Sequence, residues 1–190
     1  MQIIQLIKTI DFMSDTMLER ELPLSSMKTN KGITLLEITE NQPVMLIFLR
    51  HFGCTFCREE LDNLSKKQES IEAQGTKLVF VHMTDNKTAE KYFTEFNIKN
   101  PIHISDPECQ FYAEFGLVKG NFSQLFGFQN WSRAFNTGVL KGYGWANQIG
   151  DGFQMPGIFV LSNGEVKASY VHKFASDQAD YEELAKCCAI

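Results

Sequence analysis

Two cysteines, Cys54 and Cys57, lie three residues apart in a chain of 190 residues. This spacing permits a disulfide between them and the displacement of a partner that is held as a mixed disulfide. It is also the spacing of half a structural zinc site, which needs a second close pair of cysteines or histidines. Cys187 and Cys188 are adjacent, without a spacer, and the four histidines share no ligand spacing. Redox chemistry is therefore the main expectation, and a zinc-stabilised domain is the weaker alternative.

The elements on either side of this pair decide its reactivity. Residues 44–49 form a continuous apolar run, which predicts a central strand buried on both faces. Residues 54–74 show a helical, polar pattern, so Cys54 falls where a helix begins. Free N–H groups and a partial positive charge at that end of a helix stabilise a thiolate. Arg58 and His51 are close enough in sequence to add positive charge, although His51 is more simply explained as a surface histidine.

The rest of the chain alternates between strand and helix patterns. Alternation of this kind predicts a parallel core sheet, and Asn163-Gly164 predicts a hairpin that adds antiparallel strands. We therefore predict an α/β protein with a thioredoxin-like fold, in which helices flank a mixed sheet. The expected strands are 33–38, 77–83, 101–105, 157–161 and 165–172, and the expected helices are 88–96, 106–115 (with Pro107 in its first turn) and 181–188.

The chain length suits one main domain with additions. Residues 1–22 have an apolar stripe at helical spacing and are expected to form a helical extension. Residues 23–190 form the predicted thioredoxin-like domain. Within it, residues 117–153 are rich in glycine and aromatic residues and are expected to be an insertion, either a lid or an additional part of the core.

Composition and net charge limit the kinds of partner that the protein is expected to bind. The net charge of −5 argues against a nucleic-acid partner, because phosphate binding needs a basic surface. No apolar run approaches the ~20 residues of a membrane span, and no secretory leader is visible, so we expect a soluble protein of the cytoplasm. In that reducing compartment a C-x-x-C pair is more often catalytic or metal-binding than structural. We expect no bound cofactor and no metal.

Three segments together resemble one family. Residues 44–59, which contain both cysteines, are similar to the active-site segment of AhpC/TSA redoxins, and in particular of peroxiredoxin-like proteins with C-x-x-C. Residues 104–108, followed by Tyr112 and Gly116, resemble a peroxiredoxin segment. Residues 155–165 resemble the proline, strand and hairpin of the thioredoxin superfamily.

This resemblance implies roles for single residues. Pro156 matches a cis-proline that packs against the redox cysteines, and the backbone of Met155 before it would bind substrate. Cys57 matches the cysteine that peroxides oxidise in peroxiredoxins. Cys54 matches both the Thr or Ser of peroxiredoxins and the nucleophilic first cysteine of thioredoxins. Thr55, Phe56 and Arg58 would support the site.

The sequence departs from peroxiredoxins at Arg50, which replaces the proline that begins their motif. Arg133 is a candidate for the arginine that peroxiredoxins hold near their thiolate. Cys109 is expected to be a small buried side chain. Cys187 and Cys188 are expected to be thiols of the chain end, with a resolving role as the alternative.

Two catalytic cycles remain open, and both end at a Cys54–Cys57 disulfide. In a thiol-disulfide oxidoreductase, Cys54 attacks a partner disulfide and Cys57 resolves it. In a peroxiredoxin-like thiol peroxidase, Cys57 is oxidised and Cys54 condenses with it. The substrate would be a peroxide or a protein disulfide, and the reductant a thioredoxin- or glutathione-like thiol. A non-catalytic redox sensor or binding module that uses the same pair is the alternative to an enzyme.

Overall fold

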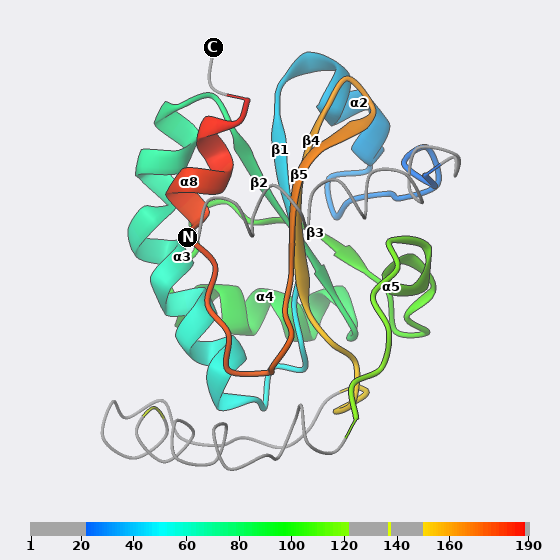
Figure 1. Ribbon diagram of the computed structural model, residues 1–190, viewed down its shortest axis with the longest axis vertical. Coiled ribbons are helices and arrows are strands. Elements are labelled where there is room, and N and C mark those ends of the chain that lie inside the picture. The colour runs from blue at the N-terminus through cyan, green and yellow to red at the C-terminus, as the bar shows by residue number, and fades with distance from the viewer. Residues whose placement is uncertain (1–21, 122–136, 138–149, 189–190) are drawn as a thin grey trace.

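A mixed sheet of five strands, in the order β3-β2-β1-β4-β5, runs through the molecule (Figure 1). The structure is a computed structural model that describes residues 22–121, 137 and 150–188. The strands are β1 (Val44–Phe48), β2 (Lys77–His82), β3 (Ile102–Ser105), β4 (Gly157–Ser162) and β5 (Glu165–Val171). The helices are α2 (Leu35–Asn41), α3 (Thr55–Ala73), α4 (Asn86–Glu95), α5 (Gln110–Glu114) and α8 (Tyr181–Lys186).

Strand β1 is the centre of the sheet, as its apolar run predicts. It pairs in parallel with β2 and antiparallel with β4, and each of its residues is buried. Strand β3 continues the parallel half, and β5 continues the antiparallel half. The predicted mixed sheet is therefore confirmed, with the β4–β5 hairpin as its antiparallel part.

Helices cover both faces of the sheet. Figure 1 shows α3, α4 and α8 on one side and α2 and α5 on the other. Side chains of β1 alternate between the two layers, since Met45 and Ile47 pack in the α3 layer while Leu46 and Phe48 pack in the α2 layer. Each layer thus has its own apolar core, and the helix that carries the cysteines is fixed along its length by one of them.

The expected strand at residues 33–38 is wrong, because this segment begins helix α2. Thr34 and Glu37 form a capping box, in which Glu37 N donates to Thr34 Oγ1 over 3.2 Å and Thr34 N donates to Glu37 Oε2 over 2.7 Å. These bonds satisfy two backbone donors that a helix start would otherwise leave unpaired. The Thr-x-x-Glu signal outweighs the apolar residues that favoured a strand.

The helix between β3 and the insertion is shorter than predicted and does not include Pro107. It begins at Gln110, because the Asp106 carboxylate accepts hydrogen bonds from three backbone N–H groups, those of Gln110 (2.9 Å), Phe111 (2.8 Å) and Tyr112 (3.2 Å). Pro107 lies in the turn before the helix. The other predicted stops and turns are confirmed: Gly75 ends α3 with a φ of 86°, and Asn163 and Gly164 turn the hairpin with φ values of 51° and 78°.

The predicted extension at 1–22 lies almost wholly outside the described residues, and so does most of the predicted insertion at 117–153. The described ends of the insertion meet in space, since Lys119 and Gln154 form an antiparallel bridge and Gly120 N donates to Phe153 O over 2.7 Å. Within the part of the chain that the structure describes, no helix is long and apolar enough to cross a membrane.

Candidate active site

Cys54 lies at the N-terminal cap of α3, a few residues after β1 ends. Its backbone N–H donates to His51 O over 2.9 Å, and its own carbonyl accepts from Arg58 N over 3.1 Å, which closes the turn from strand to helix. The hydroxyl of buried Tyr112 lies 2.5 Å from Leu49 O, so a contact across the core also holds the end of β1 in place. The predicted position of Cys54 at a helix start is confirmed.

Arg50 also belongs to the site, although the sequence did not predict a role for its charge. Its side chain is only 6% exposed, and Nη1 donates to Cys54 Sγ over 3.0 Å. Nη2 donates to Gly152 O over 2.6 Å, which anchors the guanidinium to a segment far along the chain. From the sequence Arg50 is only a departure from a proline motif. The signal that could have identified it is an arginine directly after a buried strand and one helical turn before Cys54.

The two cysteines have different environments, and both are free thiols. Cys57 is 2% exposed, and its Sγ donates to Arg50 O over 3.7 Å. Burial, and after it the negative charge of Glu60, raises the pKa of the Cys57 thiol well above its ordinary value. Cys54 instead has the Arg50 guanidinium in direct contact with its sulfur. The site therefore contains one thiol in contact with a cation and one more deeply buried thiol next to a carboxyl group.

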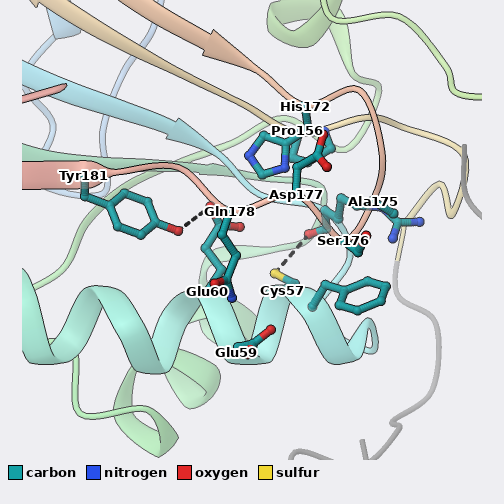
Figure 2. A pocket seen from close by; sticks show the side chains of 12 residues that line it. Cys57, Glu59, Glu60, Pro156, His172, Ala175, Ser176, Asp177, Gln178 and Tyr181 are labelled. Carbon is teal, nitrogen blue, oxygen red and sulfur yellow. Dashed lines mark hydrogen bonds between the residues drawn. The ribbon is translucent and has the colours of Figure 1, made fainter. Parts of the chain in front are cut away.

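A small hollow opens beside Cys57 (Figure 2). Phe56, Cys57 and Pro156 line it, which confirms that the helix start and the segment before β4 meet. Met155 is buried beside it against Phe56 and Ala175. The other residues that line the hollow are Arg50, Glu59, Glu60, His172, Ala175, Ser176, Asp177, Gln178 and Tyr181.

The predicted cis peptide bond at Pro156 is wrong. No cis bond occurs among the described residues, so the Met155–Pro156 bond is trans. The trans form is the lower-energy form of an X–Pro bond by about 0.5–1 kcal/mol, and only the motif favoured the other. Pro156 nonetheless lies at the hollow beside Cys57, as its motif predicts.

Two further titratable side chains face the hollow, and the sequence analysis identified neither. Burial raises the pKa of Glu60 to about 7, and Tyr181 Oη donates to Glu60 Oε1 over 3.3 Å. His172 is 6% exposed, and neither ring nitrogen has a hydrogen-bond partner within the described residues. Burial lowers the pKa of His172 to about 4, so its imidazole is neutral at pH 7.

The other predicted charges contribute less. The Arg58 guanidinium pairs with Glu95 Oε1 at 2.7 Å and stacks over Phe96, and its charge only partly offsets the rise in the pKa of Cys57 that burial causes. Burial and the charge of Arg50 lower the pKa of His51 to about 4, so His51 adds no positive charge at pH 7. Thr55 is buried as the first residue of α3. Arg133 lies outside the described residues.

The remaining cysteines are not part of this site. Cys109 is half-buried and caps α5 in a left-handed conformation, with φ of 55°. Cys187 and Cys188 follow α8, with their Sγ atoms 3.3 Å apart. Because α8 contacts α3 first through Tyr181 and Glu60, it leads the chain away from the start of α3 (Figure 1). No group of three or more metal-ligating side chains gathers in the described part of the chain.

Solved structures show the same fold. The chain aligns with peroxiredoxin 6 of Arenicola marina at a TM-score of 0.62 and 12% identity, over 87% of this chain and 69% of that one. It aligns with the bacterioferritin comigratory protein of Xanthomonas campestris at a TM-score of 0.58 and 13% identity, over 90% and 95%. These likenesses establish the predicted thioredoxin-like α/β fold.

Sequence comparison identifies the family. The chain is 26% identical to the chloroplastic thioredoxin-like protein AAED1 of Arabidopsis thaliana, over 83% of this chain and 66% of that protein, so it spans slightly less than two thirds of that relative. It is 25% identical to the prostamide/prostaglandin F synthase of Danio rerio, over 88% and 84%. The family model for the AhpC/TSA antioxidant enzyme matches residues 63–176, a range that begins after both cysteines. The chain therefore belongs to the AhpC/TSA family of peroxiredoxin-like redox proteins.

Proposed function

We propose that this protein is a thiol-disulfide oxidoreductase in which Cys54 attacks and Cys57 resolves. The contact between the Arg50 guanidinium and Cys54 Sγ, at 3.0 Å, carries this proposal. The thiolate is the reactive form of cysteine, and a neighbouring cation stabilises it. Arg50 is held by Gly152 O as well, so its charge stays beside the sulfur without substrate.

The burial of Cys57 supports the same order of events. Its raised pKa keeps it protonated near neutral pH, which makes it a poor first nucleophile. A thiol with a raised pKa suits the second step, because Cys54 Sγ, the atom that it then attacks, belongs to a residue only one helical turn away. The position of Cys54 at the N-terminus of α3 adds the partial charge of the helix to that of Arg50.

The cycle has two displacement steps. The Cys54 thiolate attacks one sulfur of a partner disulfide, which forms a mixed disulfide and releases the other sulfur as a thiolate. The Cys57 thiol then loses its proton and attacks Cys54 Sγ, which forms the Cys54–Cys57 bond and releases the second partner sulfur. The partner is reduced by two electrons. Two thiol groups of a thioredoxin- or glutathione-like reductant return the pair to its reduced form.

Peroxide reduction is the second candidate, and one observation favours it. Cys57, rather than Cys54, lines the hollow with Arg50 and Pro156, so a small peroxide entering there would meet Cys57 first. Attack by Cys57 would give a sulfenic acid and release the reduced half of the peroxide, and Cys54 would condense with it and release water. One relative, from Danio rerio, is named prostamide/prostaglandin F synthase, so the substrates of such a synthase should be tested here together with peroxides.

Single cysteine variants distinguish these routes. We would treat Cys54→Ser and Cys57→Ser with an aryl disulfide and with limiting hydrogen peroxide, follow oxidation by stopped flow, and locate the modified sulfur by mass spectrometry. We expect Cys57→Ser to retain fast attack on the disulfide and to accumulate a mixed disulfide at Cys54, and Cys54→Ser to react slowly. Fast attack by Cys54→Ser on the disulfide would contradict the proposal, and a sulfenic acid trapped quickly at Cys57 would establish the peroxidase route. Turnover with a thiol reductant would exclude a non-catalytic sensor.

A further inference from the structure

Glu60 is a buried carboxyl group that the cycle above leaves without a role. It lies three residues after Cys57 on α3, is 8% exposed, and lines the same hollow. We infer that Glu60 is the base that takes the Cys57 proton when Cys57 attacks the mixed disulfide. This inference rests on the proposed order of attack. In that order Cys57 must lose its proton before the second step, and the inference says which group takes it.

The geometry of α3 places the two side chains together. Residues three apart on a helix are neighbours on its surface, with Cβ atoms about 5–6 Å apart. Figure 2 shows Cys57 and Glu60 on the side of α3 that faces the hollow, and Glu59 lines the hollow as well. Glu60 and Cys57 thus line one hollow from the same helix, and the charge of Glu60 acts on the Cys57 thiol.

The surroundings of Glu60 suit proton transfer. Tyr181 Oη donates to Oε1, which fixes the carboxyl group at one oxygen. Burial raises the pKa of Glu60 to about 7, so near neutral pH it is partly ionised and can either accept or return a proton. Transfer of the Cys57 proton also neutralises Glu60, which removes the negative charge that disfavours the Cys57 thiolate.

Other charged groups around the hollow are less suited to this role. The pKa of His172 is about 4, because burial disfavours the imidazolium, so this ring is a weak base at pH 7. Asp177 Oδ2 already accepts hydrogen bonds from the backbone N–H groups of Lys173 and Phe174, both at 2.8 Å, so this oxygen stabilises the turn at residues 173–177. Arg50 carries no lone pair that could accept a proton. Glu59 also lines the hollow, but the carboxylate whose negative charge acts on the Cys57 thiol is that of Glu60, so Glu60 is the group placed to take the Cys57 proton.

The proton and electron balance is closed within this step. The Cys57 S–H proton moves to a Glu60 carboxylate oxygen, and the resulting thiolate attacks Cys54 Sγ. The Cys54–Cys57 bond forms as the bond from Cys54 to the partner sulfur breaks, and the partner leaves as a thiolate. Glu60 later returns its proton to Cys57 when a thiol reductant opens the disulfide.

An aryl disulfide that releases coloured thionitrobenzoate resolves the two steps in one experiment. Cys109, Cys187 and Cys188 are first replaced by serine, so that only the active pair reports. With limiting reagent, the first release depends on reagent concentration and reports attack by Cys54. The second release is independent of reagent concentration and reports attack by Cys57 on the mixed disulfide.

We expect Glu60→Gln to slow the second release about 100-fold at pH 7.5 and to leave the first within about twofold. In the parent protein the second rate should rise with pH through about 7, as Glu60 ionises. This inflection should be absent in Glu60→Gln and partly recovered in Glu60→Asp. The hydrogen bond from Tyr181 lowers the pKa of Glu60. Tyr181→Phe lacks this bond and should therefore move the inflection to higher pH. Asp62→Asn, which removes a partly exposed carboxylate that pairs with Lys66 further along α3, is the matched control and should leave both rates unchanged.

Different results would overturn the inference and the proposed function separately. An unchanged second rate and pH profile in Glu60→Gln, with both releases still present, would remove Glu60 from the mechanism and leave the order of attack intact. Loss of the first release in Cys57→Ser instead of Cys54→Ser would overturn the order of attack itself. Slowing by Glu60→Gln with the inflection near pH 7 still present would show that Glu60 only supports the packing.

Discussion

At the scale of single residues, the site depends on one cation held beside one sulfur. Arg50 contacts Cys54 Sγ at 3.0 Å and Gly152 O at 2.6 Å, so a single guanidinium joins the start of α3 to the segment before β4. A lysine has a comparable charge but not the planar fork that makes both contacts at once. The identity of this residue, and not only its charge, is therefore expected to matter.

Substitution of Arg50 tests this expectation. Arg50→Met keeps much of the length and removes the charge, so the Cys54 thiolate loses its stabilising neighbour. We expect attack by Cys54 on an aryl disulfide at pH 7 to slow by about 10–100-fold, and Arg50→Lys to recover part of the rate. The rate of the first thionitrobenzoate release measures the effect. Equal first rates in Arg50→Met and the parent protein would mean that Arg50 serves packing alone.

The residues that sequence reasoning found and missed differ in how far apart their partners lie. Cys54, Phe56, Cys57 and Pro156 belong to short motifs; the last three line one hollow, and Cys54 caps α3. Glu60 gains its environment from Tyr181, a partner 121 residues away, and a local pattern carries no information on such a contact. Arg50 was missed for the same reason, since Gly152 lies 102 residues further along the chain.

At the scale of elements, local chemistry decides where helices begin. Helix α2 replaces the expected strand at 33–38 because Thr34 and Glu37 satisfy each other's backbone donors. Central strand β1 was predictable, because an apolar run of strand length fits a strand that is buried on both faces of a sheet. Short segments with mixed signals, such as 33–38, depend on single capping residues and are the places where pattern reading fails.

Removal of the α2 cap should cost stability but not reactivity. Thr34→Ala removes the side-chain oxygen that accepts from Glu37 N, and we expect the free energy of unfolding to fall by about 1 kcal/mol. Urea denaturation measures this loss, with Thr34→Ser as the control that keeps the hydroxyl. Because α2 covers the opposite face of the sheet from α3, both thionitrobenzoate rates should stay unchanged (Figure 1). A loss of reactivity would show that α2 and the site are coupled through the sheet.

At the scale of the whole molecule, buried histidines make stability depend on pH. His82 Nε2 and His103 Nδ1 lie 2.8 Å apart in the core, and both side chains are fully buried. Burial lowers the pKa of His82 to about 3 and that of His103 to about 4, against an ordinary value near 6.5. Since the unfolded chain binds these protons more readily, stability is full above about pH 6.5 and falls as the pH drops towards 4.

Acid should therefore unfold the protein well before its carboxylates are fully protonated. We expect the free energy of unfolding to fall by roughly 5–6 kcal/mol between pH 7 and pH 5, because four histidines with a lowered pKa contribute about 2 kcal/mol each and Glu60, whose pKa is raised to about 7, opposes them by about 2 kcal/mol. In His82→Leu/His103→Leu more than half of this dependence should disappear, because only His51 and His172, whose pKa values are also about 4, and the opposing Glu60 remain. Urea unfolding at several pH values measures the slope. The same slope in the double variant and the parent protein would exclude the buried pair as its source.

The bridge between Lys119 and Gln154 has a consequence for how the length of the chain between residues 120 and 153 can vary. Because Gly120 N donates to Phe153 O, the two ends of this stretch are held next to each other. Loop-closure entropy grows only slowly with length, so the stretch between these points can lengthen or shorten at little cost to the fold. The Gly152 carbonyl that anchors Arg50 belongs to this stretch, one residue before Phe153, so a change of length that moved Gly152 would also release the Arg50 guanidinium from its place beside Cys54. Length can therefore vary here without disturbing the sheet, whereas reactivity depends on the last residues before the hydrogen bond.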